Sequence, residues 1–240
     1  MLTVILVEPE TPGNIGSVAR AMKNFGQKKL VLVNPKCDYL DGEAYGRAMH
    51  ARDLLKKATV VKKLKELKFD YLVATTAALG SDYNVVRSPI TPGQLASQLR
   101  QQCGAFNSRV TSVALVFGRE SGGLTTDEIS HCDLLVTIPA AKKYGTLNLS
   151  HAVTILLYEL FQHSTASKNS SHIPLASRNE KNIAMRMVGD ILASMDFAFD
   201  SKKETQSLVW SRLINKAFLT RREMYALLGF LRKVSERMKK

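Results

Sequence analysis

The sequence predicts an α/β protein with a parallel β-sheet, helices on both faces of that sheet, and a small helical extension at the end of the chain. Up to about residue 162, short runs rich in Val, Ile and Leu alternate with longer segments that have the apolar spacing of helices. Each run is near strand length and too uniformly apolar for a sheet with one solvent-exposed face, which favours parallel strands. Beyond residue 182 the pattern is helical only.

Five apolar runs predict the strands, and five segments with helical spacing lie between or after them. The strands are expected at residues 3–8, 29–34, 70–76, 112–118 and 134–139, and the helices at residues 15–25, 42–57, 91–103, 125–132 and 149–161. This is the order of β-α-β units, in which each helix returns the chain to the start of the next parallel strand. Ligands of such sheets bind beyond the carboxyl ends of the strands, so functional residues are expected there.

The predicted main domain covers residues 1–162. Residues 163–182 are rich in Ser and Asn and have no apolar period, which is typical of a linker. Residues 183–240 form the helical extension, in which "TRRE", beginning at Thr220, predicts a capping box before an apolar stripe. This stripe is expected to dock on the main domain, on a second copy or on a partner.

The charge of the chain indicates a polyanionic partner. The 240 residues have a formal net charge of +13 and a pI near 9.7, which favours nucleic acid or an anionic membrane face. From Asp200 onward, eleven Lys and Arg stand against four acidic residues, which is typical either of a solvated face or of an RNA-binding surface.

Other bulk features predict a cytoplasmic protein. The chain has no apolar run of about 18 residues, and its first residues lack the features of a signal peptide. Cys37, Cys103 and Cys132 show neither disulfide parity nor metal-ligand spacing, so they are interpreted as reduced, structural residues.

The first motif, "PGNIGSVARAMKNFG", follows the first strand. Asn14 is expected to cap the helix, Gly16 permits a close backbone approach, and Arg20 lies further along the helix. The motif is neither a dinucleotide fingerprint nor a P-loop, because both glycine patterns are absent.

Two further motifs follow later strands. In "LVFGRESGGLTTDEI", a strand ends at Gly118, and Glu120 lies among glycines, with Thr125 or Thr126 as the cap of the next helix. In "KYGTLNLSHAV", residues 145–148 form a loop whose backbone groups suit recognition of an adenine or a ribose. His151 taken alone is interpreted as a structural residue.

Together and in this order, "N-x-G-S-x-A-R", "F-G-x-E-x-x-G-L" and "[ST]-L-N-x-S-x-A" resemble the three signature motifs of the SPOUT superfamily. The chain is similar in particular to the TrmH family of RNA ribose 2′-O-methyltransferases, and most to its TrmJ type, over roughly residues 2–161. The resemblance implies a homodimer, S-adenosylmethionine as cofactor, and a deep trefoil knot, which is very rare among folds in general.

The resemblance also implies the site residues. The backbone at Gly118, Ile138 and the loop of Gly145, Thr146 and Leu147 would hold the adenosyl part, and the pocket would be completed by Thr75, Thr76 and Ala77. The family's functional polar positions match Asn14, Arg20, Glu120, Thr146 and Asn148. Position 146 departs from the family, which commonly has serine there; the threonine keeps the hydroxyl and adds a methyl group.

The chemistry agrees with this assignment. A sulfonium cofactor carries an activated methyl group, so the protein must align the ribose hydroxyl, and no metal is predicted. Because a guanidinium stays charged, Arg20 is expected to clamp the target phosphate and polarise the hydroxyl, with the proton leaving through that phosphate or water. Thr146 and Asn148 would orient the ribose.

The sequence is therefore interpreted as a tRNA ribose 2′-O-methyltransferase that acts at the 5′ side of the anticodon loop. Three alternatives stay open: a ribosomal RNA substrate, a non-catalytic RNA-binding protein on the same scaffold, and a nucleotide-binding enzyme of flavodoxin-like type. The second would be expected to lose Arg20, Asn14 or the glycine loops, which are all present, and the third lacks a phosphate fingerprint.

Overall fold

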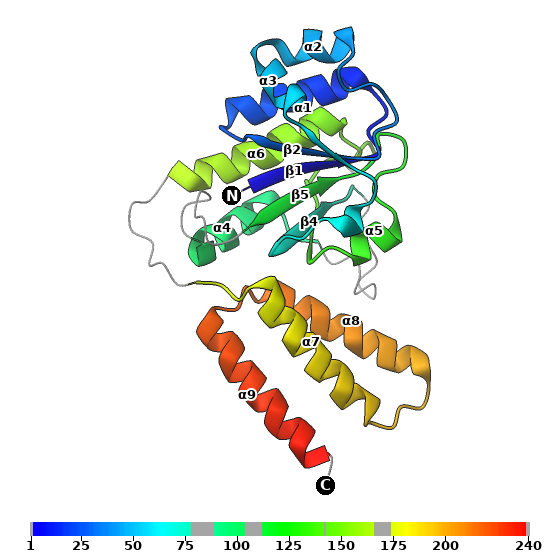
Figure 1. Ribbon diagram of the computed structural model, residues 1–240, viewed down its shortest axis with the longest axis vertical. Coiled ribbons are helices and arrows are strands. Elements are labelled where there is room, and N and C mark those ends of the chain that lie inside the picture. The colour runs from blue at the N-terminus through cyan, green and yellow to red at the C-terminus, as the bar shows by residue number, and fades with distance from the viewer. Residues whose placement is uncertain (1, 78–88, 104–111, 142, 166–173, 239–240) are drawn as a thin grey trace.

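A computed structural model of the chain describes residues 2–77, 89–103, 112–141, 143–165 and 174–238 (Figure 1). Its centre is a six-stranded sheet in the order β3-β2-β1-β5-β4-β6, in which every pair of neighbouring strands is parallel. The strands are β1 (Leu2–Val7), β2 (Lys29–Val33), β3 (Thr59–Val61), β4 (Tyr71–Thr75), β5 (Val113–Phe117) and β6 (Leu134–Val136). The predicted parallel sheet is thus confirmed.

The edge strand β3 was not predicted, because its three residues are too few to give a period. It pairs with β2 over 59–61 and leaves two of its residues exposed. The neighbouring strand supplies the hydrogen bonds that the short segment cannot obtain alone.

Helices cover the two faces of the sheet unequally. One face carries α1 (Pro12–Asn24), α2 (Gly42–Ala48), α3 (Arg52–Lys56), α4 (Pro92–Cys103) and α6 (Leu149–Thr165), while the other carries the short α5 (Thr126–Ser130) and the 3-10 helix η2 (Leu64–Glu66). Along β1, Val4 and Leu6 join the first core and Ile5 and Val7 the second, so the strand is buried on both sides. This burial explains its uniformly apolar sequence.

The predicted helix over residues 42–57 is broken in the structure. It consists of α2, the 3-10 helix η1 (Met49–Ala51) and α3, because the backbone at Met49 has a positive φ of 50°. A positive φ in a residue with a side chain interrupts the right-handed helix.

Gly16 fixes the packing of α1 against α2. A Cβ atom at this position would lie 2.2 Å from the carbonyl oxygen of Ala44, so only glycine permits the observed approach. The close approach expected from the sequence is confirmed, and it sets the position of α2 beside the first motif.

Three helices form a C-terminal unit below the sheet: α7 (Arg178–Ala193), α8 (Asp200–Lys216) and α9 (Arg221–Met238) (Figure 1). They share a core that includes Val188, Ile214, Met224 and Leu231. The predicted capping box is present, since Thr220 and Glu223 bond each other's backbone N–H groups at 3.2 and 2.7 Å. None of the helices in the described parts of the chain is long and apolar enough to span a membrane.

The C-terminal unit docks on the main domain, at the amino ends of β4 and β6. Phe218 stacks on Tyr71 with ring centroids 5.1 Å apart, and Arg178 forms an ion pair with the buried Asp133. The Lys181 ammonium donates to the carbonyl oxygen of Asp70 at 2.9 Å. The sequence left three docking partners open, and in the structure the helical extension docks on the main domain. This contact lies at the edge of the sheet opposite the carboxyl ends of the strands.

The predicted linker over residues 163–182 is too long. Helix α6 runs to Thr165, and α7 begins at Arg178 after a second capping box, formed by Ser177 and Glu180. Its apolar neighbours Leu175 and Ala176 are buried. The low apolar content of the segment concealed a helix start that side-chain hydrogen bonds define.

Candidate functional site

A continuous chain of hydrogen bonds joins the three sequence motifs beyond the carboxyl ends of the strands. The Glu120 carboxylate accepts from the side-chain amide of Asn14 at 2.9 Å. The Asn14 side-chain oxygen accepts from the amide of Asn148 at 3.0 Å, and the Asn148 side-chain oxygen accepts from the backbone N–H of Ser150 at 2.9 Å. The structure therefore brings together three of the predicted catalytic residues, which lie up to 134 positions apart in the chain.

Asn14 is not the helix cap that the sequence predicted. Helix α1 begins at Pro12 after Thr11, which makes no side-chain capping bond, and Asn14 lies in the first turn. The Glu120 carboxylate instead accepts from the backbone N–H groups of Glu10 at 2.9 Å and Thr11 at 3.3 Å. A negative group at this end is also favoured by the helix dipole. Asn14 is consequently free to face Asn148.

A second polar network holds the loop that carries Glu120. The Arg119 guanidinium donates to Glu8 at 2.9 Å and to both carboxylate oxygens of Glu128 at 3.0 Å. Glu8 also accepts from Asn34 at 2.6 Å, and Lys36 lies 3.2 Å away. Hydrogen bonds from Asn34 and Arg119 lower the pKa of Glu8 to about 2, and the bonds to Glu128 raise the pKa of Arg119.

Sequence reasoning missed this network, although a signal for it existed. Glu8 and Asn34 are the last residues of two predicted strands, and Arg119 adjoins Glu120 in the second motif. Polar residues at neighbouring carboxyl strand ends meet at one edge of a parallel sheet. The network fixes the loop and, through it, the carboxylate that orients Asn14.

Gly118 has a close neighbour in its own loop. A Cβ atom there would lie 2.1 Å from the carbonyl carbon of Gly123 and 2.3 Å from the nitrogen of Leu124. Arg119 and Gly123 exchange backbone hydrogen bonds of 3.2 and 3.0 Å, which fold the loop back. The glycine is thus needed for the loop itself, whatever it contacts in a bound cofactor.

The residues predicted to hold the cofactor lie along three neighbouring strand ends. Thr75 ends β4 between the ends of β5 and β6, where Gly118 and Ile138 follow. The Thr75 hydroxyl donates to the carbonyl oxygen of Val116 at 3.0 Å. The backbone N–H of Thr76 donates to the carbonyl oxygen of Val136 at 2.9 Å, so both groups already support the sheet. Ala77 is exposed at the last described position before residue 89.

The loop before α6 fits main-chain recognition of a nucleoside. The backbone groups of Thr146 and Leu147 form no hydrogen bond with another described residue, and Thr146 is exposed. Gly145 has space around it, since a Cβ atom would come no closer than 3.6 Å, to Ala141. These unused donors and acceptors are the kind of groups that bind an adenosyl moiety.

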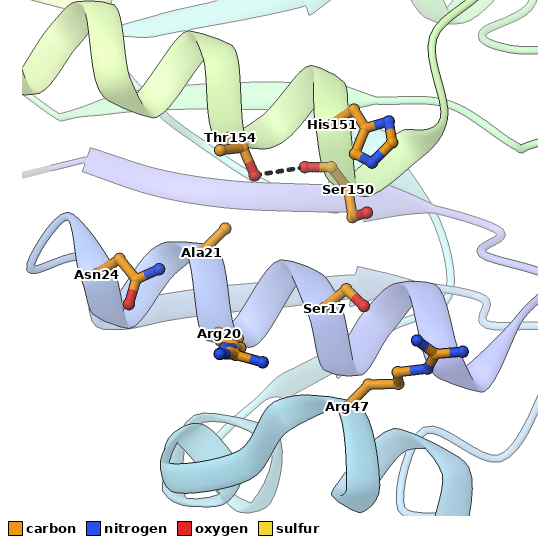
Figure 2. A pocket seen from close by; sticks show the side chains of 8 residues that line it. All are labelled: Ser17, Arg20, Ala21, Asn24, Arg47, Ser150, His151 and Thr154. Atoms are coloured by element: carbon orange, nitrogen blue, oxygen red, sulfur yellow. Dashed lines mark hydrogen bonds between the residues drawn. The ribbon is translucent and has the colours of Figure 1, made fainter.

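Two adjoining depressions lie where α1, α2 and α6 meet, and Figure 2 shows the one that Arg20 lines. One, of about 290 Å³, is lined by Arg20, and the other, of about 480 Å³, by Asn14 and Asn148. Both share the side chains of Ser17, Arg47, Ser150 and His151. We call the pair the α1–α6 groove. It gathers three predicted catalytic residues, whereas the cofactor-loop residues Gly118, Gly145 and Thr146 line neither depression.

The chain matches proteins of one family throughout its main domain. The SpoU rRNA Methylase family matches residues 1–158. The chain belongs to this family. It is 37% identical over 232 residues to the tRNA (cytidine-2'-O-)-methyltransferase TrmJ of Methanocaldococcus jannaschii, which covers 95% of this chain and 97% of the relative.

Other relatives agree over different lengths. The tRNA (cytidine/uridine/adenosine-2'-O-)-methyltransferase TrmJ of Pseudomonas aeruginosa is 40% identical over 162 residues, which cover 66% of this chain and 60% of that relative. The crystal structure of TrmJ from Z. mobilis ZM4 superimposes with a TM-score of 0.69 and 28% identity, over 98% of this chain and 99% of that one. The C-terminal unit is thus included in the likeness.

The family match confirms the resemblance that the three motifs indicated, and the likeness to solved structures confirms the predicted α/β fold. The trefoil knot and the roles of the individual site residues stay predictions.

Among the described residues, no group of three or more His, Cys, Asp or Glu is placed to hold a metal ion. Cys37 is half-buried and Cys132 is buried, which raises the pKa of the Cys132 thiol to about 12; the side chain of Cys103 lies outside the described part.

Proposed function

We propose that the protein is an S-adenosylmethionine-dependent tRNA ribose 2′-O-methyltransferase that acts at the 5′ side of the anticodon loop. The observation that carries the proposal is the hydrogen-bond chain of Glu120, Asn14 and Asn148 beside Arg20, in a member of the SpoU family. The tRNA class is supported by the relative from Methanocaldococcus jannaschii, whose name gives tRNA as its substrate and which this chain covers almost completely.

S-adenosylmethionine supplies an activated methyl group when bound, so the protein's task is to hold and orient the ribose. Arg20 keeps its positive charge, and it is exposed in the α1–α6 groove, where it can bind the phosphate of the target nucleotide. It polarises the ribose hydroxyl, whose proton leaves to that phosphate or to water.

Asn148 and Thr146 orient the ribose. One N–H of the Asn148 amide donates to Asn14, and the second N–H is left for the ribose. Because Glu120 fixes the orientation of Asn14, the Asn148 amide cannot rotate freely. The exposed Thr146 hydroxyl has no partner among the described residues. The backbone of Ile138, Gly145 and Leu147, together with the turn after β4, holds the adenosyl part.

A second copy of the chain completes the site. Helix α6 exposes Tyr158 and Phe161, with 46% and 43% of their surfaces accessible. The centroid of the Phe25 ring, directly after α1, lies 6.2 Å from that of Tyr158 and 5.8 Å from that of Phe161, which makes an aromatic patch beside the groove. This patch packs against its copy in a two-fold dimer, so that Arg20 of one subunit faces the cofactor loop of the other.

The cytoplasm, where tRNA is processed, is the location that fits this function. The net charge of +13 suits an RNA substrate. The family is described by its action on rRNA, which makes rRNA 2′-O-methylation the second candidate.

Methyl transfer to separated RNA classes tests the proposal. The purified protein with S-adenosylmethionine should label tRNA and leave ribosomal RNA unlabelled. Arg20→Met should lose the transfer while calorimetry shows unchanged cofactor binding. Labelling of ribosomal RNA alone would select the second candidate, and no labelling of either, with intact cofactor binding, would favour a non-catalytic scaffold.

Subunit mixing tests the shared site. Arg20→Ala and Gly145→Trp should each be inactive, the second because its side chain fills the cofactor loop, where the chain itself leaves room. After exchange, about half of the dimers are hybrids with one intact site of two, so activity should return to roughly a quarter of wild type. Activity that stays at background after verified exchange would contradict the shared site.

A further inference from the structure

The α1–α6 groove contains a second arginine that the proposed chemistry has not used. Arg47 on α2 lines both depressions; in Figure 2 its side chain points toward the start of α1, while Arg20 lies further along that helix and His151 lies across from them on α6. Both arginines are exposed, and neither has an ion-pair or hydrogen-bond partner in the described part of the chain.

Two other cations near α2, Lys23 and Arg52, already have partners. The Lys23 ammonium lies 2.8 Å from Asp53 and donates to the carbonyl oxygen of His50 at 2.6 Å. Arg52 donates to the carbonyl oxygen of Tyr45 at 3.1 Å. These side chains hold α3 and the end of α2 in place, whereas Arg47 has no such partner among the residues that the structure describes. An uncommitted guanidinium in a polar depression is available for an anion.

The position of Arg47 is well defined by its helix. Asp41 caps the start of helix α2, since its side chain accepts from the backbone N–H of Glu43 at 2.7 Å, and the helix packs closely against α1 at Gly16 and Ala44. Glu43 lies four residues before Arg47, a spacing that favours an ion pair on a helix, yet the two side chains form none. Arg47 is thus directed into the groove although a carboxylate is near.

The lining of the groove indicates what it binds. The hydroxyls of Ser17, Ser150 and Thr154 donate within the chain, to Gly13, Asn148 and Ser150 at 2.8, 2.8 and 2.7 Å. The donors left for a ligand therefore include the two arginines, the ring of His151 and the second N–H of the Asn148 amide. Two arginines stand against one carboxylate, that of Glu43, which lines the larger depression, so the lining has a net positive charge. Such a surface suits a charged backbone that passes through it better than an enclosed small molecule.

We propose that Arg47 and His151 form a second phosphate-binding position in the α1–α6 groove, and that they hold the phosphodiester adjacent to the one bound by Arg20. The inference rests on the proposed function, since it extends the RNA contact of the same site. Arg47 is a positioning residue: with two neighbouring phosphates held, the intervening ribose has one orientation toward the cofactor loop. His151, which taken alone looked structural, thereby gains a role.

The salt dependence of tRNA binding by the full-length protein tests the proposal. Arg47→Met removes one phosphate contact, so the slope of log affinity against log salt should fall in magnitude by roughly 0.7–0.9. The KM for tRNA should rise, and kcat should fall as well, because the ribose is no longer held in one orientation toward the cofactor loop. Arg47→Lys should keep the slope, because the charge remains, but restore only part of the affinity, because an ammonium cannot form the bidentate contact.

Lys65→Met is the matched control, because it removes one positive charge from the other face of the sheet. Its ion pair with Asp127 is exposed on both sides, at 62% and 73%, so little stability depends on it. This variant should keep the wild-type slope and KM. A slope for Arg47→Met equal to that of Lys65→Met would overturn the proposal.

A double-mutant cycle tests whether Arg47 and His151 share one phosphate. The losses of tRNA affinity in Arg47→Met and His151→Ala should not add, because either variant already weakens the same contact. Strictly additive losses would contradict a shared position. The binding measurements need no methyl transfer, so failure of the proposed function would appear in the wild type, and failure of this proposal only in the variants.

Discussion

Glu120→Gln should cost more activity than stability, because this side chain orients the site through hydrogen bonds. One carboxylate oxygen accepts from Glu10 at 2.9 Å, and the other accepts from Thr11 and Asn14 at 3.3 and 2.9 Å. A glutamine has a single acceptor oxygen, so its amide must face at least one N–H donor, and the remaining bonds lose their charge. With solvent near these groups, the free energy of unfolding should fall by about 1–2 kcal/mol.

The loss of activity comes from Asn14, which the altered residue no longer holds in one orientation. If its amide turns, the acceptor that faces Asn148 becomes a donor and the bond of 3.0 Å is lost. We expect kcat/KM to fall by about 10- to 100-fold, as small misplacements at an active site do. Urea unfolding and methyl transfer measure the two effects.

Glu10→Gln is the control for this prediction. It removes the same charge two positions before Pro12, where the side chain accepts from the Ser121 hydroxyl at 2.6 Å. It should leave kcat/KM within about twofold of wild type, since it touches neither asparagine. A Glu120→Gln protein as active as Glu10→Gln would refute the reasoning.

Three further predictions concern the loop, the pH dependence and the C-terminal unit. Gly118→Ala should lower the free energy of unfolding by about 1–3 kcal/mol, because its Cβ would lie 2.1 Å from Gly123, whereas Gly145→Ala should be nearly neutral; urea midpoints compare them. Hydrogen bonds from Asn34 and Arg119 lower the pKa of Glu8 to about 2, so the stability that this carboxylate supplies should be lost as the pH falls from about 4.5 toward 2. In acid titrations followed by circular dichroism, Glu8→Gln should show a smaller loss. Replacing the exposed Arg232 and Lys233 of α9 with Gln should flatten the salt dependence of tRNA binding if this helix contacts RNA, and an unchanged slope would assign its charges to a solvated face.

The strands of the main domain could be predicted from the sequence because burial on both faces leaves an unbroken apolar run. This pattern located β1, β2, β4, β5 and β6, and their parallel order followed from the alternation with helices. Features that depend on single backbone angles or short segments were not predictable. The break at Met49 and the strand β3 are of this kind.

The sequence identified the residues of the candidate site but not the hydrogen bonds between them. The motifs named Asn14, Glu120 and Asn148, and strand-end logic placed them at one edge, yet the hydrogen bonds between them join positions more than 100 residues apart. No local pattern specifies such pairs, which is why Asn14 was wrongly expected to cap its helix. The arginine network at Arg119 and the groove at Arg47 were missed for the same reason, because each depends on how separate elements pack.

Mapped nucleoside analysis of tRNA after reaction with the purified protein tests the central claim most directly. Unmodified tRNA would be incubated with the protein and S-adenosylmethionine, digested to nucleosides and to oligonucleotides, and analysed by mass spectrometry, with Arg20→Met as the inactive control. The account predicts one 2′-O-methylated nucleoside, with the added mass on the ribose, at the 5′ side of the anticodon loop. A methyl group on a base, or tRNA that stays unmodified while the protein binds its cofactor, would contradict it.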